Sequence, residues 1–439
     1  MKRKMIVAVF LLMSSVLLSA CSGLSHADDN RIQIVFWHSM AGPPLEALNK
    51  IVNDFNQSQD EIYVKPEYQG SYEESLAKFR RVGGTDNAPN IYQAQDIGSK
   101  YMIESGDIVP VQQLMDEEHY NMNQLERNIR NYYTVNGKLY SMPFNSSTPV
   151  VLYNADAFKK AGLDPNKPPE TYSQFREAAK KLTQANKGMK GFSFLNYPWF
   201  FEELLAVQGG EYINQNNGRT GLATKATFNS QKGLNIFKWL REMQKDGTLA
   251  NYGTSGDNES SGFLTQKVGM FMSSSASMAE MFKNAPFKVG VAYIPRPDNI
   301  ERQGVVIGGA SLWLSKGKSA KEEKAAFAFM KYMASPKSQA DWHIHTGYFP
   351  INPGAYKEPI IIKNYKKTPQ FKVAVNQFHD TKSTYATRGP MMTLMPQSRV
   401  IMSRAIDDLY QGKNLQQSLD TAADHVNEAI AQMNLANKK

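Results

Sequence analysis

The side chains with the most evident chemistry are hydroxyls, amides, aromatic rings and one arginine, gathered in a few short segments. Hydroxyl and guanidinium groups donate hydrogen bonds, and aromatic faces offer an apolar or cation-binding surface. Together such groups can recognise a small polar ligand without making or breaking a bond. The segments are 36–40, 140–154, 307–313, 346–351 and 395–399.

Motifs for catalysis are missing from the sequence. It contains no glycine-rich nucleotide motif, no Gly-x-Ser-x-Gly and no His-Glu-x-x-His. His343 and His345 would need a third ligand to hold a metal ion, and two histidines at this spacing are more often ordinary surface or core residues. Among the 41 acidic residues, no two have a spacing that identifies them as a catalytic acid–base pair. We therefore expect no enzyme activity, no cofactor and no metal.

The first residues of the chain have the order of an export signal. Lys2, Arg3 and Lys4 precede an apolar run over 5–18, and Ser19, Ala20 and the only cysteine, Cys21, follow. The segment resembles a bacterial lipoprotein signal, which implies that residues 1–20 are removed and that Cys21 is acylated. Residues 21–30 would then be a tether, and the protein would lie outside the cytoplasm, anchored to the membrane by lipid. The alternative is an ordinary secretory signal that ends in a chance cysteine.

The remaining chain has the size of a protein with two or more domains. Removal of residues 1–20 leaves 419 of the 439 residues and lowers the formal charge from +9 to +6. Lysines are interspersed with acids, as in 321–324, which is typical of solvated helix faces and argues against a nucleic-acid groove. No second apolar stretch approaches the roughly 20 residues of a membrane helix.

Strand and helix patterns alternate along this part of the chain, which predicts an α/β fold. Residues 32–37 predict a strand. Thr171 with Gln174, and Ser319 with Glu322, match the capping box that begins a helix. Further predicted elements are a strand at 289–293, two apolar runs at 305–307 and 312–314 around a break at Gly308 and Gly309, and an amphipathic helix at 415–433.

The five polar segments, taken in order, resemble the extracytoplasmic solute-binding proteins of ABC importers. The likeness is to the branch that includes the maltose- and glycerol-3-phosphate-binding proteins, and it extends from Ile32 to the last helix. It implies a type II periplasmic-binding-protein-like fold, with two discontinuous lobes joined by hinge strands and closing over a ligand. Lobe one would comprise 31–146 and 308–351, and lobe two 147–307 and 352–439.

The resemblance also implies a set of ligand-binding residues, and their chemistry suits a small phosphorylated polyol. Arg399 would bind phosphate oxygens, hydroxyls and a glycine N–H would add donors, and Asp96 would accept from glycerol hydroxyls at the other end of the ligand. Each position also has an ordinary interpretation: core aromatics, an ion pair across helices for Arg399, and a bulge at Gly308 and Gly309. The set is Tyr72, Asp96, Ser147, Ser274, Gly309, Tyr348 and Arg399.

Two departures from the family pattern affect the expected ligand. Asp96 stands where the glycerol-3-phosphate binders have glutamate, which leaves more room. The tryptophan that packs on the ligand in those proteins has no certain counterpart in 196–201, where Tyr197 or Trp199 could replace it. A larger glycerophosphodiester such as glycerophosphocholine would suit these changes, because an aromatic face attracts its cation.

The sequence therefore predicts a monomeric, lipid-anchored receptor that captures a glycerol phosphate compound by lobe closure and delivers it to an ABC permease. A sugar or oligosaccharide is the alternative ligand. Two other classes remain open: an enzyme such as a glycerophosphodiesterase, for which no acid–base or metal constellation is visible, and a sensor that uses the same closure to signal. Neighbouring permease and ATPase genes would distinguish transport from sensing.

Overall fold

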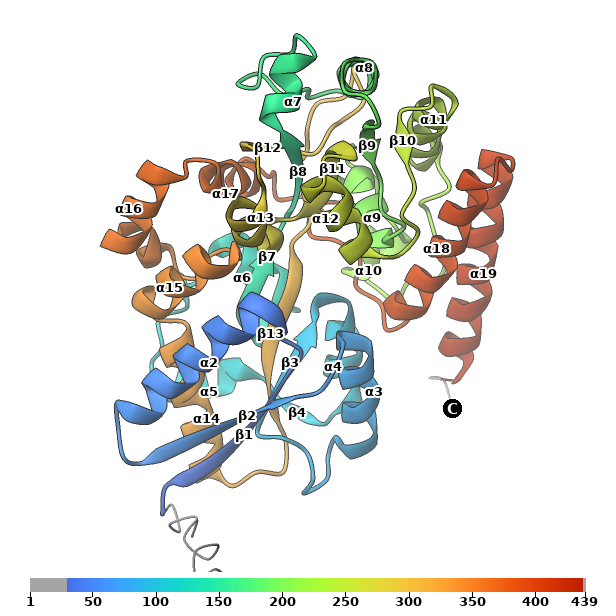
Figure 1. Cartoon of the computed structure of the whole chain (residues 1–439). Helices are drawn as coiled ribbons and strands as arrows, with labels where there is room; N and C mark the ends of the chain where they lie inside the picture. Colours follow the sequence, from blue (N-terminus) through green and yellow to red (C-terminus); the bar gives the residue numbers. More distant parts are fainter. Residues whose placement is uncertain (1–29, 437–439) are drawn as a thin grey trace, which may run out of the picture.

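The computed structural model describes residues 30–436, so Cys21, the signal and most of the tether lie outside the described residues. The described chain forms two α/β bodies, each built on its own mixed β-sheet (Figure 1). The α/β class that the alternating sequence pattern predicts is therefore confirmed. Within residues 30–436, no helix combines the length and apolar character that crossing a membrane requires.

The sheet of the first body has the strand order β2-β1-β3-β13-β4, with β7 also paired to β13. β1 is parallel to β2 and β3, whereas β13 is antiparallel to β3, β4 and β7. The strands are β1 (Ile32–His38), β2 (Ile62–Tyr68), β3 (Ile91–Gln95), β4 (Ile108–Val109), β7 (Met142–Ser147) and β13 (Gly308–Ser315).

Helices cover both faces of this sheet. Along β13, Leu312 and Leu314 pack toward α2 and α14, and Trp313 between them packs toward α3 and α4. The helices of the first body are α2 (Gly42–Gln57), α3 (Tyr72–Val82), η1 (Asp96–Gly98), α4 (Ser99–Ser105), α5 (Val111–Glu117), η2 (Met122–Gln124), α6 (Arg127–Tyr133) and α14 (Ala320–Met333); a short hairpin joins β5 (Thr134–Val135) to β6 (Lys138–Leu139).

The sheet of the second body has the order β10-β9-β11-β8-β12. Val150 and Leu152 of β8 face one core, and Val151 and Tyr153 face the other, so both sides of the sheet are buried. The elements are β8 (Pro149–Asn154), α7 (Ala155–Lys160), α8 (Tyr172–Ala185), β9 (Lys190–Ser193), α9 (Pro198–Ala206), α10 (Asn214–Gly218), α11 (Gln231–Lys245), β10 (Leu249–Ala250), α12 (Gly256–Leu264), β11 (Val268–Ser274), η3 (Ser275–Ser277), α13 (Met278–Asn284) and β12 (Val289–Ala292).

The last quarter of the chain, from α15 onward, returns from the first body to the second. α15 packs against both α2 and α13, η4 and α16 pack on α15, and α18 and α19 pack against α9 and α11 at the right of Figure 1. The elements are α15 (Pro336–Thr346), η4 (Pro353–Lys357), α16 (Pro359–Lys367), α17 (Phe371–His379), α18 (Met395–Tyr410) and α19 (Leu415–Ala436).

Most local predictions are confirmed. Both capping boxes form, at Thr171 before α8 and at Ser319 before α14, and α19 buries Leu419 and Ile430 on its apolar stripe. The glycine pair differs from the prediction: Gly308 and Gly309 begin β13 instead of separating two strands, because they pair with β7.

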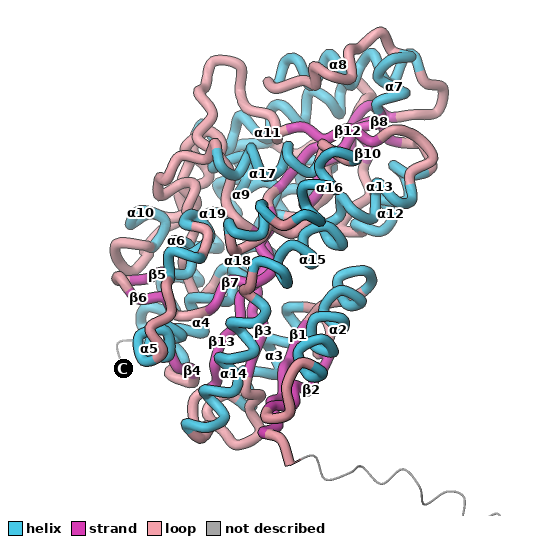
Figure 2. The backbone as a smooth tube through the Cα atoms, turned by 90° about the vertical axis from the view of Figure 1, so that its left-hand side faces the viewer, coloured by secondary structure: helices cyan, strands magenta, loops and turns pink. Residues whose placement is uncertain are grey.

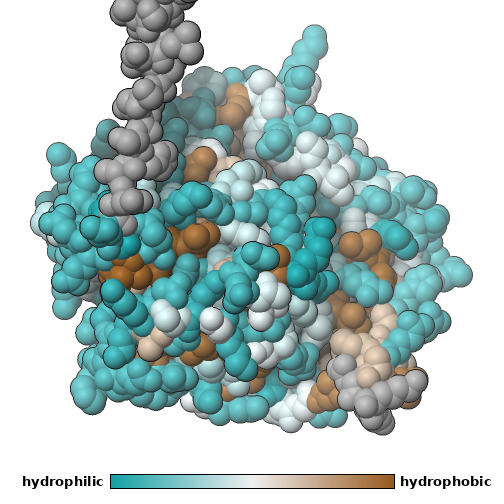
Figure 3. Space-filling view, turned by 90° about the horizontal axis from the view of Figure 1, so that it is seen from below, coloured by the Kyte–Doolittle hydropathy of each residue, from teal (hydrophilic) through white to brown (hydrophobic). Residues whose placement is uncertain are grey.

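Three connections join the bodies: the passage from β7 to β8, the entry into β13, and the return after α15. Figure 2 shows β7 and β13 between the bodies. Only Thr148 separates β7 in the first sheet from β8 in the second, and β13 returns the chain to the first sheet after β12. These positions support the lobe boundaries given above, which we retain as a proposal. Seen from below, the first body has a mainly hydrophilic surface with separate apolar areas (Figure 3).

The junction requires a glycine at position 309, which gives a first prediction. Gly309 has a φ of 105°, and a Cβ there would lie 1.8 Å from the backbone oxygen of Asn145 in β7. Gly317 is a matched control, because its φ is 86° and a Cβ would meet nothing within 4 Å. We expect Gly309→Ala to lower the free energy of unfolding by about 2 kcal/mol more than Gly317→Ala, since crowding adds to the strain of positive φ. Urea unfolding of the ligand-free proteins measures both; equal losses would contradict this role of Gly309.

Candidate ligand-binding site

The structure brings all seven sequence-predicted site residues to one cavity of about 180 Å³ between the two bodies. Five of them come from strand ends and helix starts of the first body and its return segment, and Ser274 and Arg399 come from the second body. Sequence reasoning left Tyr197 and Trp199 as alternatives, and both line the cavity. The lining is completed by Gln95, Ala276 and Gly308.

Tyr72 is fixed at the cavity by its place at the start of α3. Ser71 caps this helix: its hydroxyl accepts from the Glu74 N–H, and the Glu74 carboxylate accepts from the Ser71 N–H. The capping box sets the first helical residue, which is Tyr72, at the edge of the sheet. Burial raises the pKa of the Tyr72 hydroxyl well above 10, so the group stays protonated.

A chain of buried hydrogen bonds orients the Tyr72 hydroxyl. The N–H of Ser39 donates to Gln93 Oε1 at 2.8 Å, Gln93 Nε2 donates to Asn145 Oδ1 at 2.8 Å, and Asn145 Nδ2 donates to the Tyr72 oxygen at 2.9 Å. The Tyr72 hydroxyl also interacts with the Tyr348 hydroxyl, so the two phenols form a polar pair at the cavity. Sequence analysis missed Gln93 and Asn145 as supporting residues, although Asn145 lies in segment 140–154.

Tyr348 is held by the core beneath it. Its ring stacks on Trp342 with centroids 5.5 Å apart, and its carbonyl oxygen accepts from His343 Nδ1 at 2.7 Å. His343 Nε2 accepts from the Tyr365 hydroxyl at 3.0 Å, and burial lowers the pKa of His343 to about 4, so the ring is neutral.

The histidine pair is therefore structural in this fold. His343 is buried, while His345 is exposed and contacts the Asp341 backbone oxygen through Nδ1 at 2.8 Å. Residues 30–436 contain no cluster of three or more His, Cys, Asp or Glu side chains that is placed to hold a metal ion.

Two serine hydroxyls complete the donors around the cavity. Ser147 ends β7 and is 3% exposed. Ser274 accepts from the Ala276 N–H at 3.2 Å, which leaves its hydroxyl proton free. The neighbouring serines are used elsewhere: Ser273 bonds to Ser277, and Ser275 accepts from the Thr148 N–H. The register within 273–275 is thereby settled in favour of Ser274 as the residue at the cavity.

The glycines of β13 have structural reasons as well as a place at the cavity. A Cβ on Gly308 would lie 2.7 Å from the Trp199 ring, and the pairing of β13 with β7 shifts register between Ala310 and Ser311. This shift lies beyond the glycine pair, which pairs regularly with Ser147 and Ser146, so the bulge that was its ordinary interpretation is not found at Gly308 and Gly309 themselves. Tyr197 reaches across from the second body, and its hydroxyl lies 3.4 Å from Gln95 Nε2.

Arg399 is the centre of a buried ionic cluster. Its Nε and Nη2 donate to the two carboxylate oxygens of Glu202, each at 2.8 Å, and Nη2 lies 4.0 Å from Asp96 Oδ2. The guanidinium also lies 5.7 Å from the Tyr197 ring centroid. Arg399 lines the cavity, and it also forms the ion pair across helices that was its ordinary interpretation, between α18 and α9.

This cluster changes two expectations about the site. Asp96 lies beside the arginine, so the two groups are not at opposite ends of the cavity as the expected contacts would place them. Glu202 was missed by sequence analysis. The signal that could have found it is an acidic pair, Glu202 and Glu203, within the otherwise apolar run 198–206; a buried acid in such a run requires a partner.

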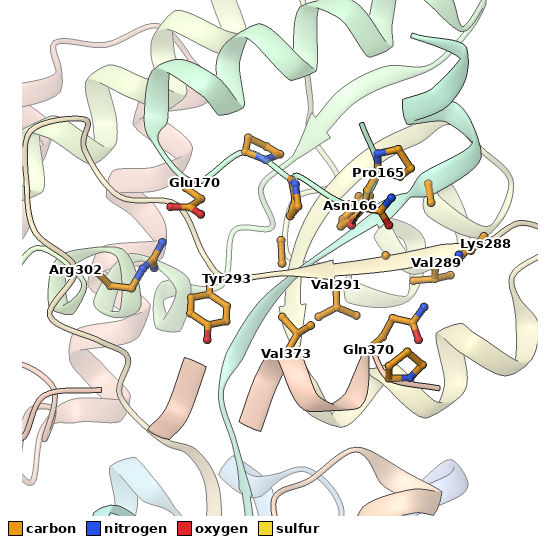
Figure 4. A pocket seen from close by; sticks show the side chains of 17 residues that line it. Pro165, Asn166, Glu170, Lys288, Val289, Val291, Tyr293, Arg302, Gln370 and Val373 are labelled. Atoms are coloured by element: carbon orange, nitrogen blue, oxygen red, sulfur yellow. Dashed lines mark hydrogen bonds between the residues drawn. The ribbon is translucent and has the colours of Figure 1, made fainter. Parts of the chain in front are cut away.

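A larger groove of about 570 Å³ lies in the second body, along the edge strand β12 (Figure 4). Pro165 and Asn166 lie on one side of the strand, and Gln370 and Val373 lie on the other. None of the seven predicted residues lines it, and its lining is mostly proline, valine and tyrosine. The smaller cavity between the bodies therefore remains the candidate site.

Two α/β bodies with a cavity of polar and aromatic side chains between them define the class of binding proteins that enclose a small solute. The chain matches the family described as bacterial extracellular solute-binding protein over residues 50–373. It belongs to this family, as the order of its polar segments predicts.

Individual relatives agree with this membership. The sn-glycerol-3-phosphate-binding periplasmic protein UgpB of Pectobacterium atrosepticum is 34% identical over 414 residues, covering 92% of this chain and 93% of the relative. UgpB of Salmonella typhimurium is also 34% identical, covering 92% and 94%.

Solved structures confirm the predicted type II fold. UgpB from Mycobacterium tuberculosis in complex with glycerophosphocholine superposes with a TM-score of 0.79 at 20% identity, covering 92% of this chain and 99% of the other. The cyclic alpha-maltosyl-1,6-maltose binding protein of Arthrobacter globiformis gives a TM-score of 0.73 at 20% identity, covering 91% and 99%. At 20% identity, the likeness to these two structures establishes the fold alone.

The burial of Asp96 gives a second prediction. Burial raises the pKa of its carboxyl from 3.8 to about 7, although Arg399 opposes the shift. The folded protein therefore keeps a proton that the unfolded chain loses. This contribution to stability is full below about pH 3.8 and is lost as the pH rises to about 7.

Asparagine keeps the shape of this side chain and does not titrate. Between pH 5 and pH 8 the wild type loses the stability that protonated Asp96 provides, whereas the Asp96→Asn variant has no such loss. We therefore expect the free energy of unfolding of the variant minus that of wild type to be about 1–3 kcal/mol higher at pH 8 than at pH 5. Denaturant unfolding at the two pH values measures this change, and Asp60→Asn at an exposed position is the control. If the free energies of unfolding of Asp96→Asn and wild type differ by the same amount at both pH values, the raised pKa of Asp96 is contradicted.

Proposed function

We propose that this protein captures a glycerol phosphate compound outside the cytoplasm, either glycerol-3-phosphate or a glycerophosphodiester such as glycerophosphocholine, and delivers it to the permease of an ABC importer. Lipid attached to Cys21 would anchor it. The observation that carries the proposal is that all seven residues expected to contact such a ligand line one cavity between the bodies. The names of two relatives support the proposal, since both relatives are glycerol-3-phosphate-binding proteins.

The donors around the cavity match the acceptors of a glycerol phosphate. No described residue accepts a hydrogen bond from Arg399 Nη1, so this nitrogen can donate to a phosphate oxygen. The Ser274 hydroxyl proton has no acceptor among the described residues, and the paired hydroxyls of Tyr72 and Tyr348 belong to the same cavity lining. Asp96 can exchange hydrogen bonds with a glycerol hydroxyl whether it is protonated or ionised.

Aromatic rings offer a place for the choline group of a glycerophosphodiester. Tyr72, Tyr197, Trp199 and Tyr348 line the cavity, and such faces attract a quaternary ammonium group. The structural neighbour from Mycobacterium tuberculosis was solved with glycerophosphocholine, and it supports this arm of the proposal through its fold.

A sugar is the second candidate ligand, and two observations favour it. Aromatic rings suit the apolar faces of sugars, and two nitrogens of Arg399 are already occupied by Glu202. The volume argues the other way: about 180 Å³ is below the roughly 300–1,000 Å³ of sites for drug-sized ligands. A small glycerol phosphate compound therefore fits this cavity better than an oligosaccharide.

Lobe closure would couple binding to delivery. The cavity takes Tyr72 and Asp96 from the first body and Ser274 and Arg399 from the second, so one ligand can contact both. Only a ligand that binds the closed form more tightly than the open form shifts the population toward closure. We propose that the backbone angles change at the direct passage from β7 to β8 through Thr148, next to the cavity residue Ser147.

The proposal is tested by isothermal titration of residues 22–439 with glycerol-3-phosphate, glycerophosphocholine and maltose in parallel. We expect heat of binding from at least one phosphate compound and none from maltose. Small-angle scattering of the same samples should show a smaller radius of gyration with ligand. Binding of maltose alone, or of none of the three, would overturn the ligand assignment.

Tyr72 provides a variant that separates the hydroxyl from the ring. We expect Tyr72→Phe to weaken binding of the phosphate compound by about three- to tenfold, the value of one neutral hydrogen bond. Tyr101→Phe, in α4 and outside the cavity lining, is the control. Unchanged affinity of Tyr72→Phe in titration would show that this hydroxyl does not bind the ligand.

A further inference from the structure

Glu202 lies directly behind the arginine of the site. It is 5% exposed, lies in α9, and holds Arg399 Nε and Nη2 at 2.8 Å through both carboxylate oxygens. It is not among the residues that line the cavity. Such a two-point ion pair fixes the plane of the guanidinium, and it leaves Nη1 as the nitrogen with no described partner.

The charges around the cavity are unusual for a phosphate site. Among the described residues that line it, Arg399 is the only cation, and Asp96 is an acid 4.0 Å from it. With Glu202 ionised, the cluster of three side chains has a net charge of zero when Asp96 is protonated and −1 when it is ionised. Arg399 thus enters binding with its positive charge already balanced.

The balance affects anions of different charge unequally. Attraction to an unpaired arginine grows in proportion to the ligand charge, so it offsets the larger desolvation of a phosphomonoester dianion. When a carboxylate neutralises the arginine, this compensation is mostly lost, while the directed hydrogen bonds from Nη1 remain. A phosphodiester has one negative charge and a smaller desolvation penalty than a phosphomonoester dianion. A neutralised arginine therefore weakens its binding less than it weakens that of the dianion.

We propose that Glu202 sets the ligand charge that the site accepts: by neutralising and orienting Arg399, it makes the cavity prefer a glycerophosphodiester monoanion to a glycerol phosphomonoester dianion. This inference rests on the proposed function and narrows its ligand class. Glu202 acts through Arg399 and is a positioning residue, because it is not itself at the cavity surface.

The chain offers a close control at the next position. Glu203 is fully buried in the same helix, but its Oε2 accepts from the Val306 N–H at 2.8 Å in the connection that leads to β13. Burial raises the pKa of the Glu203 carboxyl well above its ordinary value, so Glu203→Gln replaces a buried carboxyl at the same depth without altering the ion pair of Arg399. Glu202→Asp is a second control that keeps the charge and shortens the side chain.

The test is titration of wild type, Glu202→Gln, Glu202→Asp and Glu203→Gln with glycerol-3-phosphate and glycerophosphocholine at pH 8. At this pH the monoester is a dianion, because its second pKa is about 6. We expect wild type to bind glycerophosphocholine more tightly. Glu202→Gln should shift the affinity ratio toward glycerol-3-phosphate by about tenfold or more, whereas Glu202→Asp and Glu203→Gln should keep the wild-type preference.

Each contrary result has a separate meaning. If wild type prefers glycerol-3-phosphate, the inference is overturned without any variant. If Glu202→Gln leaves the ratio unchanged, or weakens both ligands equally and lowers the melting temperature, Glu202 is only structural while the proposed function stands. If wild type binds neither compound, the proposed function fails and this inference fails with it.

Discussion

The antiparallel pairing of β7 with β13 fixes where the two bodies meet, and the candidate site is built around it. One strand leads directly into the second sheet through Thr148, and the other returns the chain to the first. Their backbones approach so closely that position 309 has no space for a side chain. Ser147 and Gly309, at the ends of these strands, consequently lie at the cavity where the bodies come together.

Around this junction, the structure buries polar groups and gives several of those at the cavity a defined partner, whereas the indole N–H of Trp199, which also lines the cavity, has none among the described residues. The chain from Ser39 to Tyr72 and the contacts of His343 with Tyr348 and Tyr365 set the direction of hydroxyls and rings. Such networks favour a single arrangement, because an unpaired polar group in a low-dielectric interior is costly. The side chains that these networks hold at the cavity are therefore oriented before a ligand arrives, which lowers the entropy lost on binding.

The Arg399 cluster applies the same rule to charge. A guanidinium and a carboxylate can be buried together when their geometry is good, whereas either one alone would carry a large desolvation penalty. Glu202 meets this requirement by accepting two hydrogen bonds from Arg399. Burial raises the pKa of the Asp96 carboxyl, which favours its neutral form. The stability of the fold and the selectivity of the site thus depend on the same side chains, so a change in ligand charge would have to be accommodated by groups that also hold α9 to α18.

The sequence by itself determined the features that follow from local rules. Capping boxes at Thr171 and Ser319, the stripe of α19 and the β-pattern of 32–37 depend on neighbouring residues, and all appear in the structure. The order of polar segments predicted the family, the fold and the residues that line the cavity. The tertiary structure alone decided the pairings between them. Arg399 and Glu202 are 197 positions apart, and Asn145 meets Gln93 and Tyr72 only through strand packing. No local pattern specifies such contacts, because they depend on how helices and strands distant in the sequence pack together.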